Sequence, residues 1–445
     1  MIAELDVDIN RANSAHGGRI SVSIGDLIVD PVNIKYLVVR EWAFDNSRIP
    51  RLELIIMDDG AFTDLELPHQ GKIIELNIIK DKSDNVEESS LITLKGKYKI
   101  IDFEFQKSNS QQAGASFPIS ITALLDIPNI FNIAPNVSYE NKDSKTVLKS
   151  VASEFGLEFT TNIAATSDSM NWLRINSSPL NFIQHVVERS FISESDAALC
   201  YINKDKQLNY ISINSAFSGE PIKCKYNLHI ALSNTIEESI NRGKSINIEE
   251  NEVMNSIWMS SYSIKNFSNS FELLNGGFSN NVSLIDISTG SWSVPDGNSY
   301  PEASQKSSII EVDNHAKLIS TELDPNKTSF NGNRFIYNGI LPGTIKYSQN
   351  VYGIDYYHSK TTRKNVLSGL LGMPTTIEIN SNMPISIGDI LDVDVPASVH
   401  LEEDDVSEIL SGNYIVLGIL YVVDNGFFKK ILSIHRIGFN KNSNI

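Results

Sequence analysis

Carboxylates that could do chemistry lie close together at two places in this chain, Asp392 with Asp394 and the acidic run Glu402–Asp405. A pair of carboxylates can act as general acid and base on a glycosidic bond, or bind a metal ion. Asp392 and Asp394 are two positions apart, which places both on one face of a strand whose other face is apolar. We therefore interpret the pair as solvated or facing a channel. The default interpretation of Glu402–Asp405 is an exposed acidic loop, with Ca²⁺ binding as the alternative.

Other motifs for catalysis or ligand binding are incomplete. Residues Arg242–Ser245 end like a phosphate-binding loop, but Glu238 occupies the position of the first glycine. The eight histidines never occur with HxH or HExxH spacing, and no GxSxG element supplies an acyl-transfer nucleophile. The four tryptophans are too scattered for a sugar-binding platform. The sequence therefore predicts no catalytic, cofactor-binding or metal-binding residues, hence no enzyme and no cofactor.

The composition predicts an acidic chain with substantial cores. Its 445 residues favour two to four domains. Lys and Arg number 37 and Asp and Glu number 54, giving a net charge of −17, which argues against gripping nucleic acid through its phosphates. Cys200 and Cys224 provide neither a disulfide framework nor metal-ligand spacing. No signal peptide is visible, and the longest apolar run is too short to span a membrane as a helix.

Strand patterns dominate residues 18–132, which we predict to form a first β-barrel. Leu52, Leu54 and Ile56 alternate with polar residues, and the same period of two recurs in later segments. Antiparallel meanders of this kind close into barrels or sandwiches. The small polar residues of Ser108–Ser116 predict the tip of a projecting hairpin, either solvated or in contact with the next subunit or the tail tube.

The alternating strand pattern ends at residues 133–227, which we predict to form a small α+β domain. Apolar residues at helical spacing, with an N-cap at Asp143 or Ser144 and another at Ser178, indicate two helices. A hairpin with its turn at 203–206 follows the second helix.

The rest of the chain predicts a second barrel, formed by residues 228–290 and 372–445, with a loop-rich and helical insertion at 291–371. Tyr414–Val423 is apolar at nearly every position and returns as Phe427–Ile437. This pattern predicts a long hairpin whose first strand is buried on both faces. We expect one face to line a barrel and another subunit to cover the other face.

Four stretches, taken in order, together form a recognisable pattern. They are the barrel pattern of 38–131, the two-helix segment 144–191 with Trp172, Arg174, Ser178, Pro179, Phe182 and Ile183, the hairpin 198–213, and the closing strands 385–437. This order resembles the baseplate hub family of contractile-tailed phages. It is also similar to the N-terminal hub part of the valine-glycine-repeat spike proteins of type VI secretion.

The resemblance implies a mainly β fold with two tube-type antiparallel β-barrels joined by the small α+β domain, plus the insertion. It implies a homotrimer whose six barrels form a pseudo-sixfold ring, joining the sixfold tail tube to the threefold central spike and leaving a channel for DNA. The implied partners are tail tube or distal tube proteins and the spike, with baseplate wedge and tape-measure proteins as further candidates. Neither specific nucleic-acid binding nor a membrane span is implied. The implied location is the tail baseplate of the virion, after synthesis in the host cytoplasm.

Two other functions fit parts of the sequence. A distal tail or receptor-binding component would share β-rich barrels but expose a groove for a glycan or receptor. A carbohydrate-active hydrolase with a β fold would need convergent carboxylates, and Asp392 with Asp394 would be the first pair to test.

Overall fold

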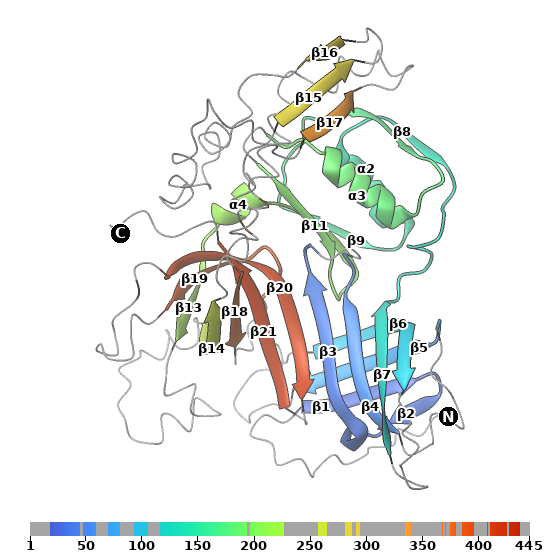
Figure 1. The fold of residues 1–445 in the computed structure, drawn as a ribbon, viewed down its shortest axis with the longest axis vertical. Coiled ribbons are helices and arrows are strands. Elements are labelled where there is room, and N and C mark those ends of the chain that lie inside the picture. The colour runs from blue at the N-terminus through green and yellow to red at the C-terminus, as the bar shows by residue number, and fades with distance from the viewer. Residues whose placement is uncertain are drawn as a thin grey trace.

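A large sheet system and a smaller α+β unit lie beside each other in the computed structural model (Figure 1). The structure describes residues 18–44, 48–58, 70–80, 93–105, 116–193, 196–226, 257–264, 281–286, 291–293, 334–339, 367, 370, 374–379, 385–395, 407, 410–424 and 427–436. The predicted class, mainly β with a small α+β part, is confirmed. No helix in these ranges is long and apolar enough to cross a membrane.

The first strand group comprises seven strands in the spatial order β3-β4-β7-β6-β5-β1-β2. They are β1 (Gly18–Ile24), β2 (Leu27–Val29), β3 (Ile34–Trp42), β4 (Arg51–Asp58), β5 (Ile73–Lys80), β6 (Thr93–Phe105) and β7 (Phe117–Leu125), with the 3-10 turn η1 (Pro31–Asn33) between β2 and β3. The predicted alternation is confirmed in β4, where Leu52, Leu54 and Ile56 are fully buried and the intervening side chains are half-buried. Period-two burial of this kind fixes the register of each strand against its neighbours.

The second strand group forms a closed ring of six strands. They are β13 (Ile222–Tyr226), β14 (Ile257–Ile264), β18 (Pro374–Ile379), β19 (Ile390–Asp394), β20 (Gly412–Asp424) and β21 (Phe427–His435). The ring closes because β19 pairs with β13 on one side and with β20 on the other. Closure leaves none of these strands as a free edge over its whole length.

Two strands belong to a different sheet from the one that the sequence predicted. The range predicted for the α+β domain included β13, which instead pairs in parallel with β14 and β19 in the ring. The range predicted for the second barrel included β15 (Asn281–Asp286), which instead pairs with β16 (Ser291–Ser293) and β17 (Arg334–Gly339) in a separate sheet. Short strands with distant partners carry no local signal for the sheet they join. The predicted domain limits otherwise stay a prediction.

The α+β unit lies between residues 137 and 217. Its elements are β8 (Val137–Lys142), α2 (Ser144–Glu154), β9 (Glu158–Thr161), β10 (Met170–Arg174), α3 (Pro179–Arg189), β11 (Ala198–Ile202), β12 (Gln207–Ser212) and α4 (Ile213–Phe217). Both predicted caps are present, because the Asp143 and Ser178 side chains accept hydrogen bonds from Thr146 N and Asn181 N. The apolar stripes of α2 and α3 are buried, and the two helices contact each other, with α2 also against β9 and α3 against β10.

Strand β20 joins the two strand groups. Its first residues pair with β19, and its second half pairs with β3 from Gly418 opposite Trp42 to Asp424 opposite Tyr36. We call this β20–β3 pairing the seam. Gly418 is required there, because a Cβ at this position would lie 2.0 Å from Trp42 Cε3.

The predicted hairpin of β20 and β21 is confirmed, but the expected role of a second subunit in burying it is wrong. Ile415 and Val416 are successive residues before the β-bulge at Leu417, and all three are 0% exposed in the single chain. The chain covers the strand itself: Gly388 and Asp389 hydrogen-bond the backbone of Val416, and α4 contacts β20. An apolar pattern shows that both faces are dry without showing which atoms exclude the water.

Several sequence predictions lie outside the described residues. They include the hairpin tip at 108–116, apart from Ser116, and nearly all of the 291–371 insertion. Within the insertion, Leu367 and Leu370 are described and both are helical.

Candidate functional site

The two aspartates singled out in the sequence lie on β19 beside lysines of β13. Asp392 is the register partner of Lys223, and Asp394 is the register partner of Lys225. Burial and then Asp392 raise the pKa of Asp394, while Lys225 and Lys223 lower it. The four charges therefore form a cross-strand ladder that offsets the repulsion between the carboxylates and supports the parallel pairing.

The other sequence candidates provide no assembled site. Residues 242–245 and 402–405 lie outside the described ranges, and within those ranges no cluster of His, Cys, Asp and Glu could hold a metal ion. His435 is buried, within hydrogen-bonding distance of Leu370 O and Ser433 Oγ, and burial lowers its pKa to about 4. Trp172 is buried and donates Nε1–H to Lys142 O. The absence of catalytic, cofactor and metal residues stays a prediction.

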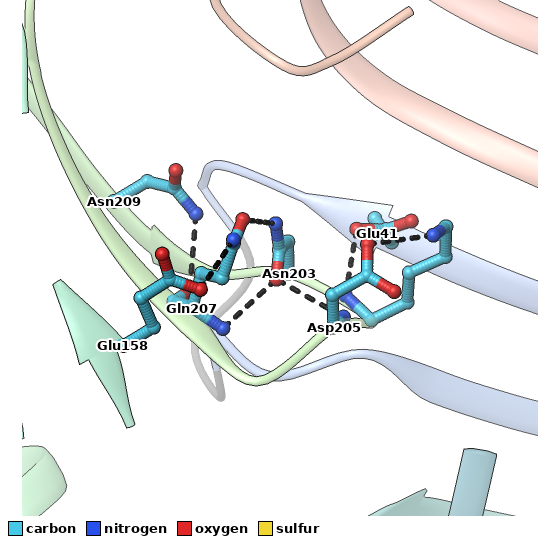
Figure 2. Close-up of polar contacts among 7 residues, drawn as sticks. Glu41, Glu158, Asn203, Asp205, Gln207 and Asn209 are labelled. Atoms are coloured by element: carbon cyan, nitrogen blue, oxygen red, sulfur yellow. Dashed lines mark hydrogen bonds and ion pairs between the residues drawn. The ribbon is translucent and has the colours of Figure 1, made fainter. Parts of the chain in front are cut away.

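The most elaborate polar arrangement lies where the β11–β12 hairpin meets the strand groups. Residues 203–206 form its turn, with a hydrogen bond from Lys206 N to Asn203 O and a positive φ of 60° at Lys206. The Asn203 side chain accepts from Asp205 N and Gln207 N at 3.0 and 2.9 Å, and so fixes the turn from within. Figure 2 shows these contacts converging on Asn203. The turn is therefore stabilised by hydrogen bonds among its own residues.

Side chains on the flank of the hairpin extend this network. Gln207 Nε2 donates to Glu158 of β9 at 2.8 Å, and Asn203 Nδ2 donates to Gln207 Oε1 at 2.7 Å. Asn209 Nδ2 donates to Gln207 O at 3.0 Å (Figure 2). The network ties the turn to the sheet of the α+β unit.

The hairpin reaches both strand groups through hydrogen bonds. Lys204 N donates to Glu41 Oε2 of β3 at 3.0 Å, and Ile202 N donates to the carbonyl that follows β3, Arg48 O, at 2.9 Å. On the other side, the Tyr201 hydroxyl donates to Ile387 O, just before β19, at 2.7 Å. One hairpin therefore contacts the first strand group and the ring.

Ionisable side chains are buried beneath the turn. Glu41 on β3 is 4% exposed and Lys430 on β21 is 5% exposed, and the Tyr421 ring of β20 lies 5.7 Å from Lys430 Nζ. Burial raises the pKa of Glu41, although the hydrogen bond from Lys204 N opposes this shift. Burial likewise lowers the pKa of Lys430 to about 8. Tyr98 of β6 is also fully buried, and burial, followed by Glu41, raises its pKa.

The buried Glu41 and Lys430 could have been found from the alternation of inward-facing and outward-facing positions along their strands. Leu37, Val39 and Glu41 occupy alternate positions of β3, so the carboxylate falls on the face of the strand that is otherwise apolar. Lys430 does the same in β21, with Leu432 and Ile434. A buried charge needs a polar or charged partner, so an ionisable residue at a core-facing strand position was the sequence signal that had been missed.

Arg174, part of the segment that carries the family resemblance, organises the α+β unit. Its guanidinium is fully buried and donates to both carboxylate oxygens of Glu154 at 2.9 and 2.7 Å. The same group lies 5.8 and 6.0 Å from the ring centroids of Phe155 and Phe182. This bidentate pair fixes α2 against β10.

Comparisons with known proteins give a likeness of fold without a likeness of sequence. No protein-family model matches the chain, and no curated protein matches it. The 43 kDa tail protein of prophage MuSo2 from Shewanella oneidensis is similar, with a TM-score of 0.51 and 9% identity over 95% of this chain and 100% of that protein. The tail protein from Neisseria meningitidis MC58 has a TM-score of 0.51 and 10% identity, over 94% of this chain and 97% of its own. The chain thus has the fold of phage tail proteins, and the hub-like fold inferred from the ordered segments is confirmed.

Proposed function

We propose that this chain is a structural hub protein of a phage tail baseplate or a related injection machine. In this proposal three copies form a ring with pseudo-sixfold symmetry, which joins a sixfold tail tube to a threefold spike. The chain carries no catalysis of its own. It assembles with tube, distal tube and spike proteins after synthesis in the host cytoplasm.

The observation that carries the proposal is the extent of the fold likeness. Two tail proteins match over 94% or more of this chain and 97% or more of their own length. The aligned region therefore extends beyond one common barrel. Because one fold can host many functions, assembly of the chain is the property that tests the tail role.

The strand arrangement supports a ring in physical terms. Two strand groups joined by the seam give each copy two β-sheet bodies, so three copies present six. A closed assembly of this kind can match a sixfold partner on one side and a threefold partner on the other.

The charge of the chain supports a channel for DNA. A net charge of −17 repels a polyanion, so DNA could slide past such a surface without phosphate contacts holding it.

The proposal is tested by the oligomeric state of the purified full chain. Mass photometry should show a trimer of the 49.4 kDa chain, about 148 kDa, at micromolar concentration or below. A reconstruction of the assembled particle should place the chain on the tail axis. Monomers at every concentration, or a peripheral position in the particle, would contradict the proposal.

The absence of catalysis is tested separately. The purified chain should not hydrolyse peptidoglycan or capsular polysaccharide. A hydrolysis that disappears in Asp392→Asn would instead support the hydrolase alternative.

A further inference from the structure

The contact between the β11–β12 hairpin and the strand groups has a polar part, which lies beside buried apolar side chains of β11. Three hydrogen bonds, donated by Tyr201, Ile202 and Lys204, join the hairpin to acceptors in or beside the two strand groups. A hydrogen bond of this kind contributes about 0.5–1.5 kcal/mol net, because undocking exchanges it for bonds to water. The hydrogen-bonded part of the contact is therefore weaker than a continuous strand pairing, and buried apolar side chains such as Ile202 add to it.

The ionisable groups under the turn make undocking easier still. Glu41, which accepts a hydrogen bond from Lys204 N of the turn, is buried, and Lys430 is also buried. Removing such groups from water is costly, and attraction between them offsets the cost only in part. When the turn lifts, the Glu41 carboxylate can be hydrated again. The docked arrangement is therefore less favoured than an apolar contact of equal size would be.

The parts on either side of this contact have their own supports. The α+β unit is held by the buried stripes of α2 and α3 and by the Arg174–Glu154 pair. The strand groups are held by their backbone ladders and by the seam. Neither set of contacts passes through the turn at 203–206.

We propose that the turn at residues 203–206 is a latch: docked on Glu41, it fixes the orientation of the α+β unit against both strand groups, and without that bond the hairpin undocks while each part stays folded. The latch is a property of the single chain and does not depend on the proposed tail function.

Hydrogen exchange of the full chain, measured by mass spectrometry, tests the latch at its acceptor. In Glu41→Ala, exchange at residues 198–212 should become at least tenfold faster, while exchange in α3 and β4 should be unchanged. Glu41→Gln keeps an acceptor oxygen for Lys204 N and should resemble the unmodified protein. Glu75→Ala, which removes an exposed carboxylate of the same strand group, should change nothing at the hairpin.

A matched pair of variants tests the donor. Lys204 is the second residue of the turn, where proline is favoured, so Lys204→Pro deletes the N–H while keeping the turn. It should accelerate exchange at 198–212 as Glu41→Ala does. Lys204→Ala removes the side chain but keeps the N–H, and should leave exchange unchanged.

The double variant Glu41→Ala with Lys204→Pro should exchange no faster at 198–212 than either single variant, because both remove one bond. Two results would overturn the latch. Faster exchange throughout the chain would make Glu41 part of one cooperative core. Unchanged exchange at 198–212 in Glu41→Ala and Lys204→Pro would show that other contacts hold the hairpin.

Discussion

The seam and the latch both begin at β3, yet they are built from different interactions. At the seam, seven residue pairs from Gly418–Trp42 to Asp424–Tyr36 form a continuous ladder, and the side chains of Val39 and Ile419 are buried. Burial of apolar surface contributes about 25 cal/mol per Å², so a contact of this kind accumulates stability with area. The latch instead exchanges a few hydrogen bonds with water. The seam thus governs whether the chain folds, and the latch governs how its parts are oriented.

The largest effect should come from a charge placed in β20. Leu417→Asp and Val416→Asp should each destabilise the chain by about 5 kcal/mol or more, because both positions are fully buried within one copy. Thermal melts followed by circular dichroism should show a lost or non-cooperative unfolding transition. Asn413→Lys, which places a charge at an exposed position of the same strand opposite Asp392, should melt normally. A folded but unassembled Val416→Asp or Leu417→Asp protein would restore the idea that a subunit covers that face.

The free energy of unfolding should depend on pH through the buried Lys430 but not through its exposed neighbour Lys429. The pKa of Lys430 is about 8 in the folded chain and 10.5 ordinarily, so the unfolded chain binds more protons between these values. This contribution to stability is complete above pH 10.5 and is lost as the pH falls through about 8. Urea unfolding at pH 7.5, 9 and 10.5 should show a gain of up to ~3 kcal/mol that Lys430→Met lacks.

The control for this titration is the adjacent position. Lys429 is exposed and pairs with Glu378, so Lys429→Met should keep the same rise in stability with pH. An equal pH slope in Lys430→Met and the unmodified chain would show that Lys430 is hydrated in the folded protein.

Arg174→Ala should have an intermediate effect that is confined to the α+β unit. It removes a bidentate bond to a partly exposed Glu154, so a loss of about 2 kcal/mol is expected, less than for a fully buried pair. Faster hydrogen exchange should appear in α2 and α3 but not in β4 or β7. Arg40→Ala, which removes a surface ion pair with Glu53, should cost about 0.5 kcal/mol or less. Equal losses in the two variants would mean that the buried pair does not organise the unit.

The smallest effect should come from Tyr201→Phe. The variant keeps the ring but leaves Ile387 O without its donor, and about 1 kcal/mol should be lost. Chemical denaturation can measure this against Tyr36→Phe, an exposed position at which no change is expected. A loss as large as that of a β20 variant would erase the distinction between the seam and the latch.

The sequence could predict features that depend on neighbouring residues. The alternation of Leu52, Leu54 and Ile56, and the caps at Asp143 and Ser178, are local patterns with direct physical causes. The β20–β21 hairpin was equally visible, because two apolar runs flank a short turn sequence.

Features that depend on distant parts of the chain could not be predicted in the same way. The apolar sequence of β20 predicted that both faces of the strand are buried, but it did not identify the residues that cover them. The pairing of β13 with β19 joins segments separated by most of the second half of the chain. The buried ionisable residues Glu41 and Lys430 were missed for another reason. Each lies in a strand whose sequence otherwise looks regular, and no spacing rule connects the two positions.

The seam also has a consequence for synthesis on the ribosome. Gly418 pairs with Trp42, which emerges 376 residues earlier (418 − 42). At about 5–20 residues per second, β3 waits roughly 20–75 s for this partner. During that time one edge of a strand rich in apolar residues has no seam partner and is open to other nascent chains on the same message. The burden on chaperones should therefore fall on the first strand group, and truncated products ending before β20 should aggregate more than the finished protein.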